Sequence, residues 1–330
     1  MIAINLTGKQ PTKRQKLIDL LPLEAPLVVQ IFPIYSCNFK CNYCVFQIPV
    51  IDRHFISNQV KMEFKDFVKS INDMKKFKNK IKVIRFVGIG EPLLHNELHK
   101  MIAYTKKSNV CEKIELITNG YLLSRFKTLE LIGSGLDRIV ISIQGLTTQQ
   151  YNKNCGLSLN RIDFEWFINN LRFLYRAKKQ CDIYIKAVDS VLPDQIDKKN
   201  FYTLFGDICD YIAIETTVPI HQGVELKERD TTQFGHELKE VNICPQPFFH
   251  LQINPDMAVV PCYSFEYPEI IGNLKSESFY DVWNGKKLNN FRKKLINSNK
   301  NKTCKECNII KYRMHDEDNL CKNIMEKVYL

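Results

Sequence analysis

Segments with the apolar pattern of β-strands alternate with helix-like segments along most of this 330-residue chain. Strand patterns lie at 27–32, 81–87, 113–118, 138–143, 183–188 and 211–215. Helical patterns lie between them at 63–77, 97–107, 122–133, 164–178 and 195–205. Because strands that alternate with helices run parallel, we expect six parallel strands that curl into a partial (β/α)6, TIM-like barrel of the α/β class. Ligand sites in such barrels gather at the carboxyl ends of the strands.

A group of three cysteines follows the first strand directly. Cys37, Cys41 and Cys44 form a C-x3-C-x2-C array, with Tyr43 before the last cysteine. Three thiolates leave one iron of a four-iron cluster open to bind a small molecule, whereas structural zinc and electron-transfer clusters normally take four protein ligands. From the spacing alone, zinc or a closed cluster remains an alternative.

A glycine-rich turn follows the second strand, with the sequence Gly88-Ile89-Gly90-Glu91-Pro92. Glycine lets a backbone approach a ligand closely, and the carboxylate of Glu91 can accept hydrogen bonds from an ammonium group. In isolation the segment is equally compatible with an ordinary turn. Its position, one helix and one strand after the three cysteines, favours a binding role.

Together the two motifs resemble those of the radical S-adenosylmethionine (SAM) superfamily. The resemblance implies that the open iron chelates the amino and carboxylate groups of SAM, and that an electron cleaves SAM to a 5'-deoxyadenosyl radical. The turn is similar to the GGEP motif of that family, which binds the SAM amino group. It therefore implies Gly88, Gly90 and Glu91 as SAM contacts, with Ile89 in place of the usual middle residue.

Further SAM contacts are expected at the carboxyl ends of later strands. Asn119 ends the third strand, and Ser142 and Gln144 lie two residues apart and so face the same side of the fourth. Lys186 and Glu215 are ionisable residues inside apolar strands, so each must meet a counter-charge, a ligand or solvent. Lys186 is a candidate to bind the SAM carboxylate, and an ordinary ion pair is an equally good interpretation. For Ser142 and Gln144, the alternative is that they are ordinary residues of a turn at the strand end.

Four more cysteines form a second pattern near the C-terminus. Cys244 and Cys262 flank a predicted hairpin, 249–254 and 258–261, which would bring the two thiols together, and Cys304 and Cys307 follow as a C-x2-C pair. Four thiolates make a closed set, with a zinc ribbon as the alternative to a cluster. The sequence of residues 270–285 resembles that of SPASM and twitch domains, which bind auxiliary iron-sulfur clusters. Because the next cysteine is Cys321, the single-cluster twitch version fits better.

These patterns divide the chain into three parts. We expect an N-terminal extension at 1–26, the radical SAM barrel at 27–220, and a twitch or SPASM-like domain with a β-hairpin, a helix and a C-terminal tail at 221–330. The expected cofactors are two 4Fe-4S clusters, one that binds SAM and one auxiliary, and SAM itself.

The remaining cysteines are interpreted from their positions. Three precede strands and are predicted to pack at the barrel's amino end: Cys111, Cys181 and Cys209. Cys155, in a loop beyond the fourth strand, and Cys321, in the C-terminal segment, are candidate hydrogen-atom donors to a substrate radical. For both, a surface or packing role is the alternative.

Composition narrows the setting of this chemistry. Seven of the twelve cysteines stand in ligand spacings, and because the chain also shows no apolar leader or membrane span, we expect a cytoplasmic protein. The formal charge of +11 falls to about +8 when clusters of about −1 and −2 are counted. This charge would suit an acidic flavodoxin or ferredoxin as electron donor. No nucleic-acid-binding motif and no membrane partner is expected, and the basic run 292–302 reads as a solvated helix end.

The sequence thus predicts a radical SAM enzyme that removes a hydrogen atom from its substrate. A second cluster offers an electron acceptor, so oxidation (dehydrogenation) of a small polar, carbohydrate-type molecule, such as a sugar or cyclitol derivative, is the first interpretation. Epimerisation with a cysteine hydrogen donor and maturation of a ribosomal peptide are alternatives. A non-enzymatic iron-sulfur or zinc scaffold also stays open.

Overall fold

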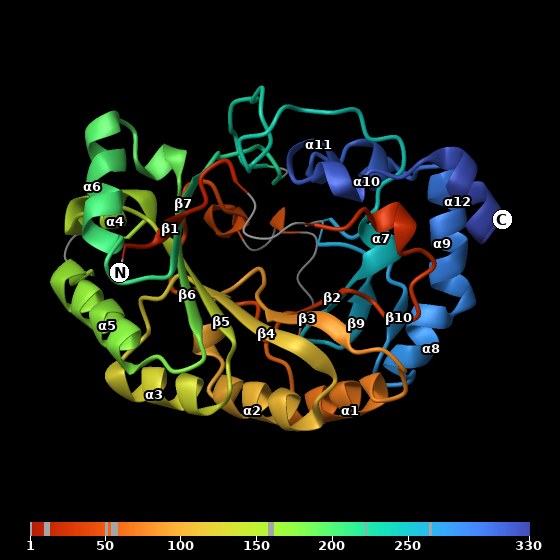
Figure 1. Cartoon of the computed structure of the whole chain (residues 1–330), viewed down its shortest axis with the longest axis horizontal. Coiled ribbons are helices and arrows are strands. Elements are labelled where there is room, and N and C mark those ends of the chain that lie inside the picture. The colour runs from red at the N-terminus through yellow and green to blue at the C-terminus, as the bar shows by residue number, and fades with distance from the viewer. Residues whose placement is uncertain are drawn as a thin grey trace.

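The computed structural model describes residues 2–9, 14–49, 52–53, 59–157, 162–221, 223–263 and 266–330. In this part of the chain, ten strands form one sheet in the order β1-β7-β6-β5-β4-β3-β2-β8-β9-β10. The sheet curves like an open barrel, and helices line its outer side (Figure 1). The segment after β7 and the last helices cross the open side of the barrel.

The six central strands are parallel and are those that the sequence predicts. They are β2 (Val28–Ile31), β3 (Ile81–Phe86), β4 (Cys111–Thr118), β5 (Arg138–Ile143), β6 (Asp182–Val188) and β7 (Tyr211–Glu215). The helices between them are α1 (Phe64–Met74), α2 (Leu98–Ser108), α3 (Arg125–Gly133), α4 (Thr148–Asn154), α5 (Phe164–Ala177) and α6 (Gln195–Phe205). The partial barrel is confirmed; α4 is the one of these helices that the sequence pattern did not predict.

The alternation of side chains along β5 gives the sheet two different faces. Ile139, Ile141 and Ile143 are almost fully buried and pack in the main core beneath the helices. On the opposite, concave face, Arg138 forms an ion pair with Asp182 of the neighbouring strand at 3.2 Å. The inside of the barrel is therefore polar, while the layer between sheet and helices is apolar.

Both edges of the predicted barrel gain a further parallel strand. β1 (Ile4–Asn5) pairs with β7, and β8 (His250–Ile253) pairs with β2. An edge strand exposes unpaired backbone N–H and C=O groups, and these additions satisfy them. The expected N-terminal extension and C-terminal domain are thus joined to the barrel through one continuous sheet, which local sequence patterns do not reveal.

The predicted hairpin is present and continues this sheet. β9 (Ala258–Val260) runs antiparallel to β8 and pairs in turn with β10 (Gly272–Asn273). The helices of the C-terminal part are α7 (Gln246–Phe249), α8 (Phe279–Asn284), α9 (Lys286–Ile296), α10 (Lys302–Lys305), α11 (Ile309–Tyr312) and α12 (Lys322–Tyr329). Single 3₁₀ turns lie at Leu17–Asp19, Val45–Gln47, Pro92–Leu94, Asp189–Val191 and Asp316–Asp318.

Arg292 departs from the expected solvated helix end. Its guanidinium lies 4.3 Å from the ring centroid of Trp283 and donates a hydrogen bond to the carbonyl of Pro247. The residue is 5% exposed, because α9 packs against α8 and α7 on this side. Lys293 and Lys294, on the other side of the helix, are exposed as expected.

Among the helices of the described ranges, none combines the length and the apolar character that crossing a bilayer requires.

Candidate active site

The three cysteines of the first motif lie in the loop that leaves the carboxyl end of β2. The backbone N–H of Cys44 donates a hydrogen bond to the carbonyl of Cys41. This turn brings the two thiols close enough for an electrostatic interaction. Burial, followed by the charge of Cys41, raises the pKa of Cys44 to about 12, and burial also raises the pKa of Cys37. The three thiols are partly buried, and because their thiolate forms would repel one another, a bound cation would stabilise those forms.

The loop is held from behind by the end of α4. Lys40 and Asn42, on either side of Cys41, donate backbone hydrogen bonds of 2.9 Å to the carbonyls of Cys155 and Asn154. The thiol of Cys155 shares a hydrogen bond with Cys41 and is fully buried. The expected position of Cys155 in a loop corresponds to the turn that directly follows α4, where the residue packs against Cys41.

The glycine-rich turn packs directly on the same loop. Gly90 has φ of 146°, and a Cβ atom there would lie 2.2 Å from the carbonyl oxygen of Ile34. The N–H of Glu91 donates to the carbonyl of Ser36 at 2.8 Å. Glycine at position 90 therefore allows the turn to pack closely against the protein's own backbone. This packing fixes the turn against the cysteine loop.

The carboxylate of Glu91 connects three segments. Its Oε1 accepts hydrogen bonds from the hydroxyl of Thr118 at 2.6 Å and from the N–H of Leu93 at 2.9 Å, and its Oε2 accepts from the N–H of Asn119 at 2.7 Å. Burial raises the pKa of Glu91, and these hydrogen bonds oppose that rise. The side chain of Asn119 donates to Asn38 at 2.8 Å. The two motifs and the end of β4 thus meet at one edge of the barrel, as predicted.

A buried donor in this site supports a bound group. Nδ2 of Asn38, next to Cys37, is buried and has no hydrogen-bond partner among the described residues. An unpaired buried donor costs free energy, and a ligand acceptor would remove that cost. Three convergent thiols with a free amide donor beside them fit a cluster that also binds SAM. Among the described residues, the three cysteines included, no three His, Cys, Asp or Glu side chains are placed to hold a single metal ion.

The remaining predicted SAM contacts already have protein partners. Gln144 accepts a hydrogen bond from the hydroxyl of Tyr43 at 2.5 Å and donates to the carbonyl of Ser142 at 3.1 Å. Lys186 forms a 2.8 Å ion pair with Glu215, so the ion-pair interpretation describes its position in this structure. A role of these residues toward SAM stays a prediction.

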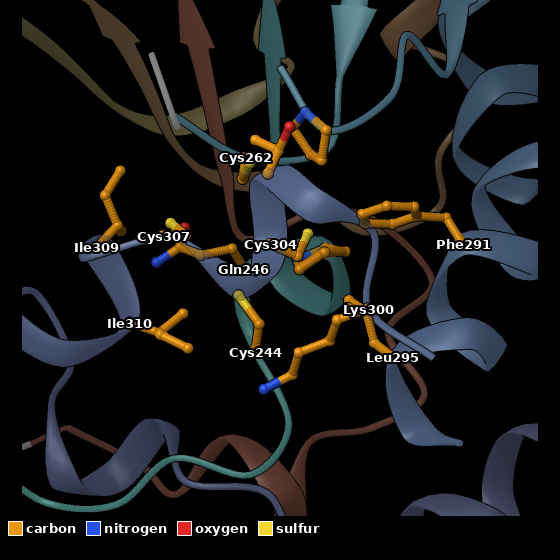
Figure 2. A pocket seen from close by; sticks show the side chains of 13 residues that line it. Cys244, Gln246, Cys262, Phe291, Leu295, Lys300, Cys304, Cys307, Ile309 and Ile310 are labelled. Carbon is orange, nitrogen blue, oxygen red and sulfur yellow. The ribbon is translucent and has the colours of Figure 1, made fainter. Parts of the chain in front are cut away.

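The four C-terminal cysteines line one cavity. Cys244 precedes α7, Cys262 follows β9, and Cys304 and Cys307 lie in and after α10. Figure 2 shows their sulfur atoms facing a shared space. The rest of the lining is mostly apolar and includes Phe291, Leu295, Ile309 and Ile310. Burial raises the pKa of Cys244 to about 12 and that of Cys304 to about 11. The hairpin brings Cys262 to Cys244 as predicted, and the donor set fits a cluster closed by four thiolates.

The other cysteines lie away from both sets. Cys321 is exposed and directly precedes α12, a helix that lies at the outer edge of the molecule (Figure 1). Cys181 and Cys209 are buried in the main core, as predicted. Cys111 is the first residue of β4 and not, as expected, a residue before it, but it packs against the main core at the amino end of the strand, as predicted.

Sequence reasoning missed Arg53 and Asn38, which lie close to the cysteine loop. Asn38 stands between two ligands of the motif, and its polarity is the available signal. Arg53 is nine residues beyond Cys44 and carries no motif. Only the folded loop shows that it contacts Phe46, two residues beyond Cys44.

Two family models match the segments that contain these cysteines. The model of the radical SAM superfamily matches residues 31–186, and that of SPASM, an iron-sulfur cluster-binding domain, matches residues 244–308. A tungsten-containing aldehyde ferredoxin oxidoreductase cofactor-modifying protein of Pyrococcus furiosus is 26% identical over 299 residues, which are 78% of this chain and 80% of that protein.

Two solved structures share the fold. BtrN in complex with AdoMet and 2-DOIA has a TM-score of 0.55 at 16% identity, with 89% of this chain and 98% of that chain covered. Streptococcus suis SuiB bound to precursor peptide SuiA has a TM-score of 0.61 at 16% identity, with 94% and 75% covered. At these identities the similarity shows the fold alone.

Proposed function

This chain belongs to the radical SAM superfamily and carries a SPASM-type iron-sulfur domain, and from that premise we propose that it oxidises a small polar molecule by removing a hydrogen atom. Cys37, Cys41 and Cys44 would hold a 4Fe-4S cluster that binds SAM, and the chemistry that this cluster and SAM would supply, with an electron from a donor, is a 5'-deoxyadenosyl radical. The proposed donor is an acidic flavodoxin or ferredoxin, because the chain is basic.

The residues around the triad would position SAM and exclude water. Glu91 is fixed by three hydrogen bonds and offers its remaining lone pairs to the SAM ammonium group. Asn38 offers a free amide donor next to Cys37. A rigid, desolvated site of this kind holds the reacting atoms in register, which is the main contribution of a protein to cofactor chemistry.

The closed set of Cys244, Cys262, Cys304 and Cys307 is the observation that supports oxidation. A substrate radical becomes a stable oxidised product when it loses one electron and one proton. A cluster held by four thiolates has no open iron for a ligand, so electron acceptance is the role left to it.

The position of this set also supports electron transfer. β8 is hydrogen-bonded to β2 along four residue pairs, about 10 Å of strand. The triad follows the carboxyl end of β2, whereas Cys244 precedes α7 and β8, and Cys262 follows β9, which runs back along β8. The two ligand sets therefore flank opposite ends of one short strand pair.

A polar substrate is supported by the inner face of the barrel. Ion pairs there include Arg85 with Glu115 at 2.7 Å and Lys186 with Glu215 at 2.8 Å. Charged groups at a partly solvated surface favour hydroxyl, amine or carboxylate groups over an apolar ligand. The fold shared with BtrN in complex with 2-DOIA is consistent with a sugar or cyclitol derivative.

The alternatives have weaker support. An epimerase needs a thiol that faces the substrate, whereas Cys155 is fully buried behind Cys41 and Cys321 lies at the outer edge. Peptide maturation has the fold shared with SuiB in its favour.

Anaerobic incubation with SAM and dithionite tests the proposal. We expect 5'-deoxyadenosine from the wild type and none from Cys41→Ala, while no product from either would indicate a scaffold. Incubation with deuterated aminocyclitols and sugars should then transfer deuterium into 5'-deoxyadenosine. Turnover of peptides with no transfer from any carbohydrate would contradict the substrate class, and solvent deuterium in the product would indicate epimerisation.

A further inference from the structure

Arg53 is a buried cation in the segment that follows the cysteine loop. It is 9% exposed. Its Nε donates to the carbonyl of Ile48 and one terminal nitrogen donates to the carbonyl of Phe46, both at 2.7 Å. The guanidinium also lies 4.4 Å from the ring centroid of Phe46. These three contacts fix its position without neutralising its charge.

The charge of Arg53 has no carboxylate partner. No ion pair of the described residues includes it, and the segments outside those residues contain no Asp or Glu. The titratable groups that act on its charge are Cys44 and Cys37 in their thiolate forms, and its hydrogen bond to Phe46 ties it to the residue two positions after Cys44. A buried charge is costly unless it meets an opposite charge, so the partner must come from what those cysteines bind.

The arrangement has a direct electrostatic consequence. A 4Fe-4S cluster with three protein thiolates carries about −1 when oxidised and gains one negative charge on reduction. A fixed positive charge nearby stabilises the more negative, reduced form. In a buried setting this attraction is weakly screened by salt.

We propose that Arg53 is a positioning residue that acts as the counter-charge of the SAM-binding cluster and makes its reduction easier. Its two hydrogen bonds, to the carbonyls of Phe46 and Ile48, hold the guanidinium against the turn that directly follows Cys44. The inference rests on the cluster at the triad and is independent of the substrate, so it survives if the proposed oxidation is wrong.

Two variants separate charge from structure. Arg53→Gln removes the charge and keeps a hydrogen-bond donor, while Arg53→Lys keeps the charge and loses the planar fork that contacts both carbonyls. Each reconstituted, SAM-free protein is poised at a series of potentials, and the reduced cluster is measured by electron paramagnetic resonance. The signal that changes when SAM is added belongs to the triad cluster, and the auxiliary cluster serves as an internal reference.

In Arg53→Gln we expect the ratio of reduced to oxidised triad cluster to fall about tenfold at a fixed potential, a shift of about 59 mV to more negative values for one electron. Arg53→Lys should stay within about twofold of the wild type. The reference cluster should not move in either variant. Iron content establishes that the cluster has assembled.

Three results would overturn the inference. The first is an assembled Arg53→Gln protein with the wild-type ratio. The second is a tenfold loss in Arg53→Lys, which would mean that the hydrogen bonds rather than the charge matter; this result decides the question even where Arg53→Gln does not assemble. The third is an unchanged ratio with SAM affinity lowered tenfold in Arg53→Gln, which would make Arg53 a SAM contact instead.

Discussion

The hydroxyl of Thr118 donates a 2.6 Å hydrogen bond to the carboxylate of Glu91, and so joins the end of β4 to the turn after β3. Glu91 is 1% exposed, and its orientation is set by this bond and by two backbone donors. The expected SAM-binding carboxylate is therefore held in place by a residue of the neighbouring strand.

This relationship gives the first prediction. Thr118→Val removes the hydroxyl at nearly constant volume, and a lost hydrogen bond to a charged group costs about 1.5–3 kcal/mol. We expect SAM affinity to fall about tenfold or more, with iron content unchanged. Anaerobic titration with SAM measures it. Thr203→Val is the matched control, because that hydroxyl bonds within exposed α6; unchanged affinity in Thr118→Val would remove Thr118 from the site.

The second prediction concerns Gly90. In Gly90→Ala the new Cβ atom would meet the carbonyl of Ile34 at 2.2 Å, so the turn must move away from the cysteine loop. We expect a lower thermal transition and less iron at the triad. Gly133→Ala is the control, since its Cβ atom meets nothing within 4 Å and should be neutral or stabilising by up to about 1 kcal/mol. Equal behaviour of the two variants would contradict the close packing seen here.

The third prediction separates two roles of Cys155. Because this thiol is buried against Cys41, Cys155→Ser should retain 5'-deoxyadenosine formation and substrate oxidation, with an altered absorption spectrum of the cluster. Cys209→Ser is the control, a buried thiol that bonds to the carbonyl of Phe205 in the main core. Loss of product with intact SAM cleavage in Cys155→Ser alone would support the hydrogen-donor hypothesis.

The fourth prediction concerns the auxiliary site. Replacement of Cys304 and Cys307 together by alanine should lower the iron content from about eight to about four per chain. SAM cleavage should persist, while oxidised product should be lost with its electron acceptor. Cys321→Ala, at an exposed thiol outside the cavity, should change neither quantity. Zinc in place of four irons in the wild type would refute the auxiliary cluster.

The fifth prediction concerns acid sensitivity. Burial, with the nearby charge of Arg85, lowers the pKa of His250 to about 3 from its ordinary 6.5. Between about pH 6.5 and 3 the unfolded chain therefore binds a proton at His250 that the folded chain does not bind. The free energy of unfolding is thus highest above about pH 6.5 and falls as the pH decreases toward 3. Between pH 7.5 and 5.5 we expect the wild type to lose about 1.4 kcal/mol more than His250→Gln. Denaturant midpoints at both values measure this; equal losses would contradict a neutral buried imidazole.

Local patterns were enough to predict most of the fold and the two groups of cysteines. Strand and helix periodicity reports burial within one element, and cysteine spacing reports which thiols can reach one metal group. These signals gave the barrel, the triad, the turn with Glu91 and the four auxiliary cysteines. They did not reveal β1 or the pairing of β8 with β2, because backbone pairing across more than two hundred residues leaves no local pattern.

The sequence by itself determined the chemistry of this protein, since thiolate number and spacing fix whether a cluster has an open iron. The tertiary structure alone decided how that chemistry is supported. It placed Cys155 behind Cys41, buried the unpaired charge of Arg53 beside Cys44, and packed Arg292 on Trp283. Each of these relationships is a contact between segments whose own sequences carry no sign of the partner, and only folding brings them within the few ångströms over which hydrogen bonds and buried charges act.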